Sequence, residues 1–101
     1  VEQLLNNIPT EFSLGQNYPN PFNPITTINY SLPERSDINI SVYNVVGQEI
    51  AVLLNMQKEH GYHSTSWNGI DRYGKPVSSG VYFARMTTMN FSQTKKMLLL
   101  K

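Results

Sequence analysis

Side chains that could act in catalysis are few in this chain of 101 residues. It has two histidines, His60 and His63, two aspartates and no cysteine. Its serines are scattered, and none stands in a Gly-x-Ser-x-Gly sequence, which places a nucleophilic serine on a sharp strand-to-helix turn. His63 alternates with Thr65 and Trp67, which indicates a half-buried strand position whose imidazole is satisfied rather than a general base. The residues therefore predict that the protein is not an enzyme.

The segment from Trp67 to Val77 offers one alternative with ligand chemistry, a calcium loop. Calcium takes about six to eight oxygen ligands, several of them carboxylates. This segment supplies a single aspartate, Asp71, beside Asn68 and the cations Arg72 and Lys75. Its Asn-Gly pair suits a tight turn, in which the aspartate accepts hydrogen bonds from nearby backbone amides. The sequence predicts no metal and no cofactor.

The charge pattern gives no sign of a nucleic-acid ligand. The net charge is +1, with charged residues at 15% and both signs interspersed. No glycine-rich phosphate loop is present, and the basic residues lack interleaved aromatics on one face. The longest apolar run, Met97 to Leu100, is far shorter than the roughly 18–20 residues of a membrane-spanning helix. We therefore expect no nucleic-acid partner and no membrane-spanning segment.

The length and composition suit one small domain. Hydrophobic residues make up 40% of the chain, enough for a single core at this size. Without cysteines the fold must be stabilised by packing rather than by disulfides. The polar start, ending in Ile8-Pro9-Thr10, predicts a linker over residues 1–11 from an upstream domain. A short helix over Glu2 to Asn6 is an alternative within it, and the domain itself is expected over residues 12–101.

From Phe12 onward the apolar residues recur with a period of two. Ile28, Tyr30 and Leu32 share one face of a predicted strand, and the same alternation runs from Ile38 to Tyr43. Further runs bounded by turn-forming residues are Glu49 to Leu54, Gly61 to Trp67, Val81 to Thr87 and Phe91 to Leu100. With Phe12 to Gln16 as a lead strand, the pattern predicts an all-β fold, an immunoglobulin-like antiparallel β-sandwich of about seven strands. The turn before Glu49 contains Gly47, which is free to take a positive φ.

Three prolines fall within Tyr18 to Pro24. Proline fixes φ and lacks a backbone donor, so we expect a rigid ribbon that does not pair, laid across the sandwich with Tyr18 and Phe22 as apolar anchors. Such rigidity suits either bracing of the fold or a recognition surface. A proline-rich ligand for an aromatic groove is a third interpretation.

The last strands carry two further motifs. Gly80 is expected to permit a bulge or a close backbone approach, and Tyr82 to bury its ring and send its hydroxyl to a backbone partner. At the end of the chain Lys96 and Lys101 stand five positions apart, so on one strand they would point to opposite faces. Together with Lys95 they would also protect an exposed edge from pairing with other chains.

Four of these segments occur in an order that resembles a known family. They are Pro19-Asn20-Pro21-Phe22, Val42 to Glu49, Gly80-Val81-Tyr82 and the closing stretch from Lys96 to Lys101. Together they resemble the type A C-terminal sorting domain of cargo proteins of the bacterial type IX secretion system, also called the Por secretion system. The resemblance spans roughly Phe12 to Lys101. The chain departs from the family at Asn68, where aspartate is more usual.

The resemblance implies a function as an address rather than an enzyme. A domain of this kind directs an attached cargo protein through the type IX translocon and is cleaved afterwards by a sortase. The implied location is secreted or cell-surface, reached through the periplasm and outer membrane of a Gram-negative bacterium, and we expect a monomer. The residues predicted for translocon contact or fold support are Pro19, Asn20, Pro21, Phe22, Gly80, Tyr82, Lys96 and Lys101, with the terminal carboxylate beside the last of them.

The alternative function is a non-catalytic accessory or spacer module of immunoglobulin or fibronectin type. One form would bind carbohydrate through Trp67, Tyr62 or Tyr73, and would require an exposed row of aromatic rings. Another would be a structural cap that resembles a domain of flagellar hook-capping proteins. A spacer tolerates residues on both sides, whereas a sorting domain must be terminal.

Overall fold

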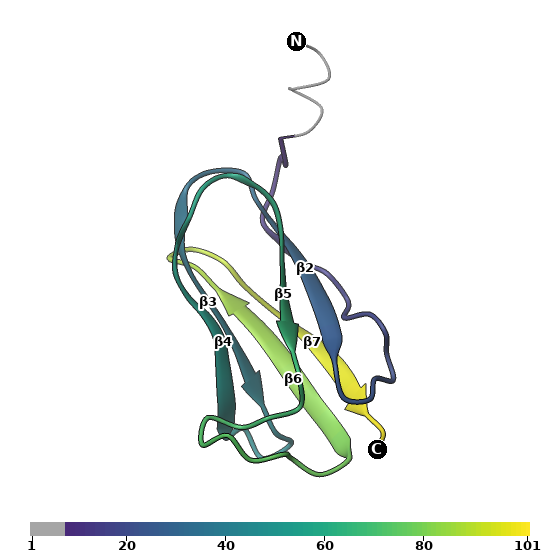
Figure 1. Cartoon of the computed structure of the whole chain (residues 1–101). Coiled ribbons are helices and arrows are strands. Elements are labelled where there is room, and N and C mark those ends of the chain that lie inside the picture. The colour runs from purple at the N-terminus through teal and green to yellow at the C-terminus, as the bar shows by residue number, and fades with distance from the viewer. Residues whose placement is uncertain (1–7) are drawn as a thin grey trace.

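Two antiparallel β-sheets pack face to face in the computed structural model, which describes residues 8–101 (Figure 1). The first sheet has the order β1-β2-β5 and consists of β1 (Ser13–Leu14), β2 (Thr26–Leu32) and β5 (Gly61–Trp67). The second has the order β4-β3-β6-β7 and consists of β4 (Glu49–Lys58), β3 (Ser36–Tyr43), β6 (Gly80–Thr87) and β7 (Ser92–Leu99). The predicted all-β sandwich of seven strands is confirmed.

The chain crosses between the sheets three times, after β2, β4 and β5. This Greek-key path is that of the immunoglobulin-like class, with the fourth strand in the larger sheet. The helix considered over Glu2 to Asn6, and most of the linker predicted over residues 1–11, lie outside the described residues. Within residues 8–101 no helix has the length and apolar character needed to cross a membrane.

The period-two pattern locates the strands well, and the largest differences from the predicted bounds are in two strands. The lead strand is shorter than expected because its continuous pairing with β2 is limited to Ser13 and Leu14. In contrast, β4 continues past Leu54 to Lys58, and it skips two residues, Ile50 and Leu53, in its pairing with β3. These β-bulges break the alternation and hide the second half of the strand from the sequence pattern.

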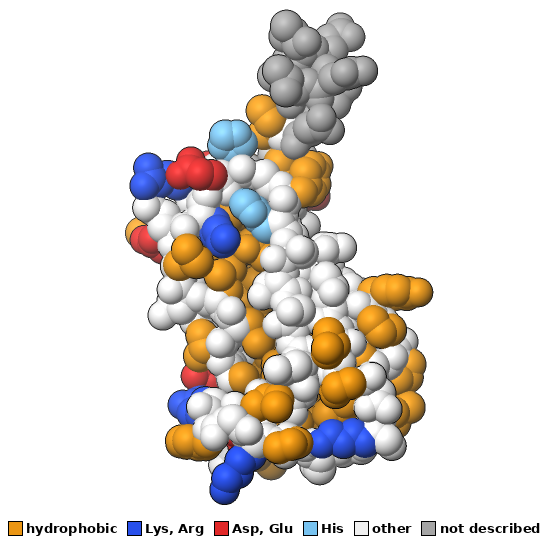
Figure 2. Space-filling view, viewed as in Figure 1, with side chains coloured by type: hydrophobic (Ala, Val, Ile, Leu, Met, Phe, Trp, Pro, Cys, Tyr) orange, Lys and Arg blue, Asp and Glu red, His pale blue; other side chains and the backbone are white. Residues whose placement is uncertain are grey.

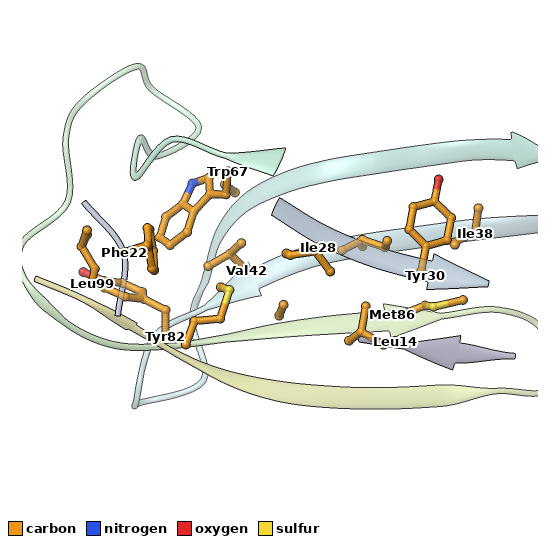
Figure 3. Packing of buried hydrophobic residues seen from close by; sticks show 14 of the residues in the cluster. Leu14, Phe22, Ile28, Tyr30, Ile38, Val42, Trp67, Tyr82, Met86 and Leu99 are labelled. Atoms are coloured by element: carbon orange, nitrogen blue, oxygen red, sulfur yellow. The ribbon is translucent and has the colours of Figure 1, made fainter. Parts of the chain in front are cut away.

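The core lies between the sheets and is built from the alternate residues of each strand. Apolar side chains from all seven strands contribute, and Figure 3 shows most of them as one continuous layer. The fully buried members with the largest side chains are Phe22, Leu14, Ile28, Leu32, Ile40, Met86, Met97, Leu99 and Val42. Phe22 is the one among these that comes from outside the strands, so the loop that holds it is part of the core.

The outer face of the first sheet is polar and uncharged. Its strands present hydroxyl and amide side chains outward, among them Thr27, Asn29, Ser64 and Ser66. Figure 2 shows this face, with white neutral side chains across the middle and the charged side chains toward its two ends. Short polar side chains of this kind suit a sheet face in contact with water.

Candidate recognition surface at the C-terminal end

The proline-rich segment pairs with the outer edge of β7. Phe22 donates its N–H to the Leu98 carbonyl at 2.9 Å, and its own carbonyl accepts the N–H of Leu100 at 3.0 Å. Asn20 extends this contact, because its Oδ1 accepts the N–H of Leu98 at 3.0 Å. Two motifs that lie far apart in the sequence, the Pro-Asn-Pro-Phe ribbon and the final strand, therefore form one structural unit.

The expectation that the ribbon does not pair is wrong, since the residues between its prolines keep their backbone groups. The two expected apolar anchors also differ in burial. Phe22 is 2% exposed, whereas the Tyr18 side chain is 81% exposed, although Tyr18 exchanges two backbone hydrogen bonds with Thr27 at 2.8 and 2.9 Å. The Pro19 carbonyl accepts the hydroxyl of Thr26 at 2.8 Å, while the Pro21 ring is exposed. The ribbon is thus fixed at both ends, by backbone contacts at one and by a buried ring at the other.

The rings of Tyr82 and Phe22 both pack against the indole of Trp67. The Tyr82 ring packs edge-on against the indole with centroids 5.2 Å apart, and the Phe22 ring lies 5.7 Å from it. Figure 3 shows these three rings with Leu99 at one end of the core. The Tyr82 hydroxyl donates to the Ser78 carbonyl at 2.7 Å, which is the arrangement of a tyrosine corner. The predicted burial and backbone partner of Tyr82 are confirmed.

Gly80 opens β6 without a bulge. The pairing of β6 with β7 is continuous from Gly80 opposite Leu99 to the end of the hairpin, and no atom lies within 4 Å of the place where a Cβ would stand. The expectation of a bulge or a close approach is therefore wrong. Glycine suits this position because its φ of 152° is one that other residues rarely adopt.

The two terminal lysines are both exposed, but they are not related by strand geometry. Lys96 lies within β7 opposite Phe83. Since β7 ends at Leu99, the alternation that predicted opposite faces does not reach Lys101. The Lys101 N–H instead donates to Ser79 Oγ at 2.9 Å, which ties the end of the chain to the loop before β6.

Five of the eight predicted residues thus lie around the end of β7, namely Asn20, Phe22, Gly80, Tyr82 and Lys101. Each of them pairs with this strand, forms a hydrogen bond beside its end or follows it in the chain. In Figure 1 this end of the sandwich, marked C, is opposite the end at which the described chain begins. Lys96 lies further back along the same strand.

Some contacts at this end carried no signal in the sequence. Gln16 donates through Nε2 to the Lys96 carbonyl at 2.7 Å, further along the same edge of β7. Asn17 is buried, and its Nδ2 donates to Thr26 Oγ1 at 2.9 Å and to the Pro19 carbonyl at 3.1 Å. Both residues directly precede the ribbon. The one feature of the sequence associated with these contacts is that two amide side chains stand next to a proline-rich segment.

The alternative sites take other roles in the structure. Asp71 Oδ1 accepts the N–H groups of Tyr73 and Lys75 at 2.9 and 3.0 Å, as expected of a loop brace. Residues 8–101 contain no group of three or more His, Asp or Glu side chains placed to hold a metal. Trp67 is 2% exposed, Tyr62 lies near the start of β5, and Tyr73 lies in the loop after the other end of that strand. The exposed aromatic row required for the carbohydrate-binding form is therefore not formed.

His63 occupies the half-buried strand position that its alternation predicts. Its Nε2 lies 2.8 Å from the Glu59 carbonyl, and its ring stacks on Tyr30 with centroids 5.3 Å apart. Burial raises the pKa of the Tyr30 hydroxyl above its ordinary value, because loss of water disfavours the phenolate. The two rings face each other across β2 and β5, where Tyr30 stands opposite His63.

Comparison with known proteins points to one family. The model of a family described as secretion system C-terminal sorting domain matches residues 16–100. Dimeric latent PorU from Porphyromonas gingivalis contains a similar fold, with a TM-score of 0.72 and 16% identity over 91% of this chain. PorZ of the same bacterium, described as an essential surface component of its type-IX secretion system, gives a TM-score of 0.58 and 20% identity over 89%. No curated protein matches the sequence.

The chain spans only 10% of the PorU chain and 11% of the PorZ chain. At such low identities the likeness to these two proteins concerns the fold alone, whereas the family match covers the ribbon and the whole of the final strand.

Proposed function

The chain belongs to the family of secretion system C-terminal sorting domains of the type IX system, and from this premise we propose that it is a type A signal, which takes an attached cargo protein through the translocon and is then cut off by a sortase. The cargo reaches the cell surface or the medium across the outer membrane of a Gram-negative bacterium. The domain has no chemistry of its own and acts as a monomer. The accessory-module alternative has no observation in its favour.

The pairing of Asn20 and Phe22 with Leu98 and Leu100 is the observation that best supports this proposal. It joins two of the family's motifs into one edge, which is held in shape before any partner binds. A preformed surface loses less conformational entropy on binding than a disordered terminal peptide. The sandwich thus serves to present its own last strand.

We assign the predicted residues to two roles. Phe22, Gly80 and Tyr82 support the fold, since two are buried in the core and the third supplies a backbone conformation that favours glycine. The exposed residues Lys96 and Lys101 contact the translocon, and Pro19, Asn20 and Pro21 fix the course of the ribbon beside them.

The domain boundary belongs to the same proposal. Residues 1–11 link the cargo to the domain, and the sortase cuts there because an exposed polar segment admits a protease more readily than a paired strand. The ordered contacts already begin before Phe12, since Pro9 is buried and the Glu11 carbonyl accepts the Ser31 hydroxyl at 3.2 Å. We therefore place the cut before Pro9.

The experiment fuses residues 1–101 to the C-terminus of a periplasm-targeted fluorescent reporter in a bacterium with a type IX system. Deleting the last strand would be a poor test, because Met97 and Leu99 are completely buried and their loss would unfold the domain. The test variant is instead Lys96→Ser/Lys101→Ser, and its control is Lys58→Ser/Lys75→Ser, which changes the net charge equally.

We expect release of the wild-type and control fusions, with retention of the test variant although its domain is folded. Retention of all three fusions with folded domains would refute the sorting function. Equal release of all three would refute the role of the two lysines.

A further inference from the structure

The outer face of the second sheet changes character along its strands. At the end near the C-terminus the pairing sets Tyr43 opposite Phe83 and Val81 opposite Leu98. In the neighbouring β3–β4 turn, Val45 lines a shallow groove together with both aromatic rings. We call this surface the valine-aromatic patch; it consists of Tyr43, Val45, Val46, Val81, Phe83 and Leu98.

The patch is exposed although it is apolar. Val45 and Val46 are 70% and 73% exposed, and the other four side chains are partly exposed. Further along β6 and β7, and at Asn39 of β3, the outward residues become polar, the others being Arg85, Thr87, Ser92 and Thr94. A contiguous apolar surface with a polar border on a small domain is typical of an interaction site.

The turn that carries the two valines is held rigidly. Asn44 Oδ1 accepts the N–H groups of Val46 and Gln48 at 3.1 and 3.0 Å. The backbone closes the same turn, since Gly47 donates to the Asn44 carbonyl and Asn44 to the Gln48 carbonyl, both at 3.0 Å. Gly47 has a φ of 85°, as its sequence context predicts. Because the turn is already fixed, a partner that binds it loses little free energy to ordering of the chain.

The charges beside the patch are basic. Arg85 lines the groove, and Lys96 lies directly opposite Phe83 in β7. The nearest acid in the same cross-strand row is Glu49, opposite Tyr43, but its carboxylate is paired with Arg72 at 3.0 Å. The field at the patch therefore favours a partner with carboxylates around an apolar centre.

We propose that the valine-aromatic patch docks a protein surface of the translocon that presents apolar side chains bordered by carboxylates. This inference rests on the proposed sorting function and names the part of the domain that is recognised. The patch is continuous with the paired ribbon and β7, because Leu98 belongs to the patch through its side chain and to the ribbon pairing through its backbone. The partner thus contacts the sheet face and the final strand together.

The test uses the reporter fusion with two pairs of variants. Val45→Ser/Val46→Ser removes the most exposed apolar side chains of the patch, and Met56→Ser/Met89→Ser is its control at exposed positions elsewhere, 52% and 93% exposed. Arg85→Glu reverses the charge at the groove, and Lys75→Glu makes the same change on the loop after β5. We expect each patch variant to reduce release by about tenfold, as the loss of an interface hot spot does, with the controls unchanged.

Urea unfolding of each purified domain completes the experiment, and we expect unchanged midpoints because the substituted side chains are exposed. If the wild type is released and the patch variants are released equally well, the inference fails while the sorting function stands. If the wild type itself is retained, both fail. Sedimentation provides one further outcome: a wild-type dimer that Val45→Ser/Val46→Ser converts to monomers would assign the patch to a second copy of the chain and overturn the proposal.

Discussion

At the residue scale, the buried aromatic residues explain why the motifs of this domain must occur together. Trp67 packs against both Phe22 of the ribbon and Tyr82 of β6, and its Nε1 donates to the Ile70 carbonyl at 2.9 Å. Each ring contributes about 1.5–3 kcal/mol of burial free energy, and a change in one alters the packing of the other two. Loss of export after mutation of Phe22 or Tyr82 therefore reports on folding before it reports on contact.

Tyr82 gives the clearest test of that distinction. Tyr82→Phe removes the hydrogen bond to the Ser78 carbonyl and keeps the ring, so we expect the free energy of unfolding to fall by about 0.5–1.5 kcal/mol. Export per folded molecule should not change. Urea titration and the reporter fusion measure the two effects, and a variant that keeps its full stability but is no longer exported would place Tyr82 at the translocon.

At the element scale, the central feature is that β7 is an edge strand whose outer side is covered. The ribbon supplies hydrogen-bond partners to Leu98 and Leu100, and Gln16 supplies one to Lys96. An edge strand left open invites pairing with other chains. The ribbon therefore protects the same strand that the sorting function needs to present.

A substitution of Asn20 measures how much a single hydrogen bond contributes to the protection of β7. Asn20→Ala removes the acceptor of the Leu98 N–H and leaves Phe22 as the partner of Leu100. Losing about 1 kcal/mol of local protection should speed hydrogen exchange at Leu98 about fivefold, with Leu100 nearly unchanged. Equal acceleration at both amides would mean that the ribbon opens as a unit, and no acceleration would contradict the role of Asn20.

The strands were largely predictable from the sequence, and their assembly was not. Gly61 to Trp67 has the predicted bounds because its alternation is regular and glycine and asparagine flank it. The pairing of Phe22 with β7 leaves no local pattern, because backbone hydrogen bonds form whatever the side chains are. Tyr18 was misplaced for a related reason: an aromatic residue beside prolines predicts burial only on average, and here the backbone is fixed while the ring faces water.

At the scale of the whole molecule, the two ends of the domain are suited to different tasks. The described chain enters at one end of the sandwich, and the ribbon, the end of β7 and the loop before β6 meet at the other (Figure 1). A cargo attached through the linker would thus stand away from the proposed recognition surface, which includes the valine-aromatic patch.

The most direct test of the account places the reporter fused to residues 1–101 in two strains that differ only in whether the type IX translocon is functional. Reporter fluorescence is then measured in the medium, at the cell surface and in the periplasm. We predict export only in the strain with the translocon and accumulation of the folded fusion in the periplasm of the other. Equal distribution in the two strains, with the domain folded in both, would contradict the claim that this domain is a type IX sorting signal.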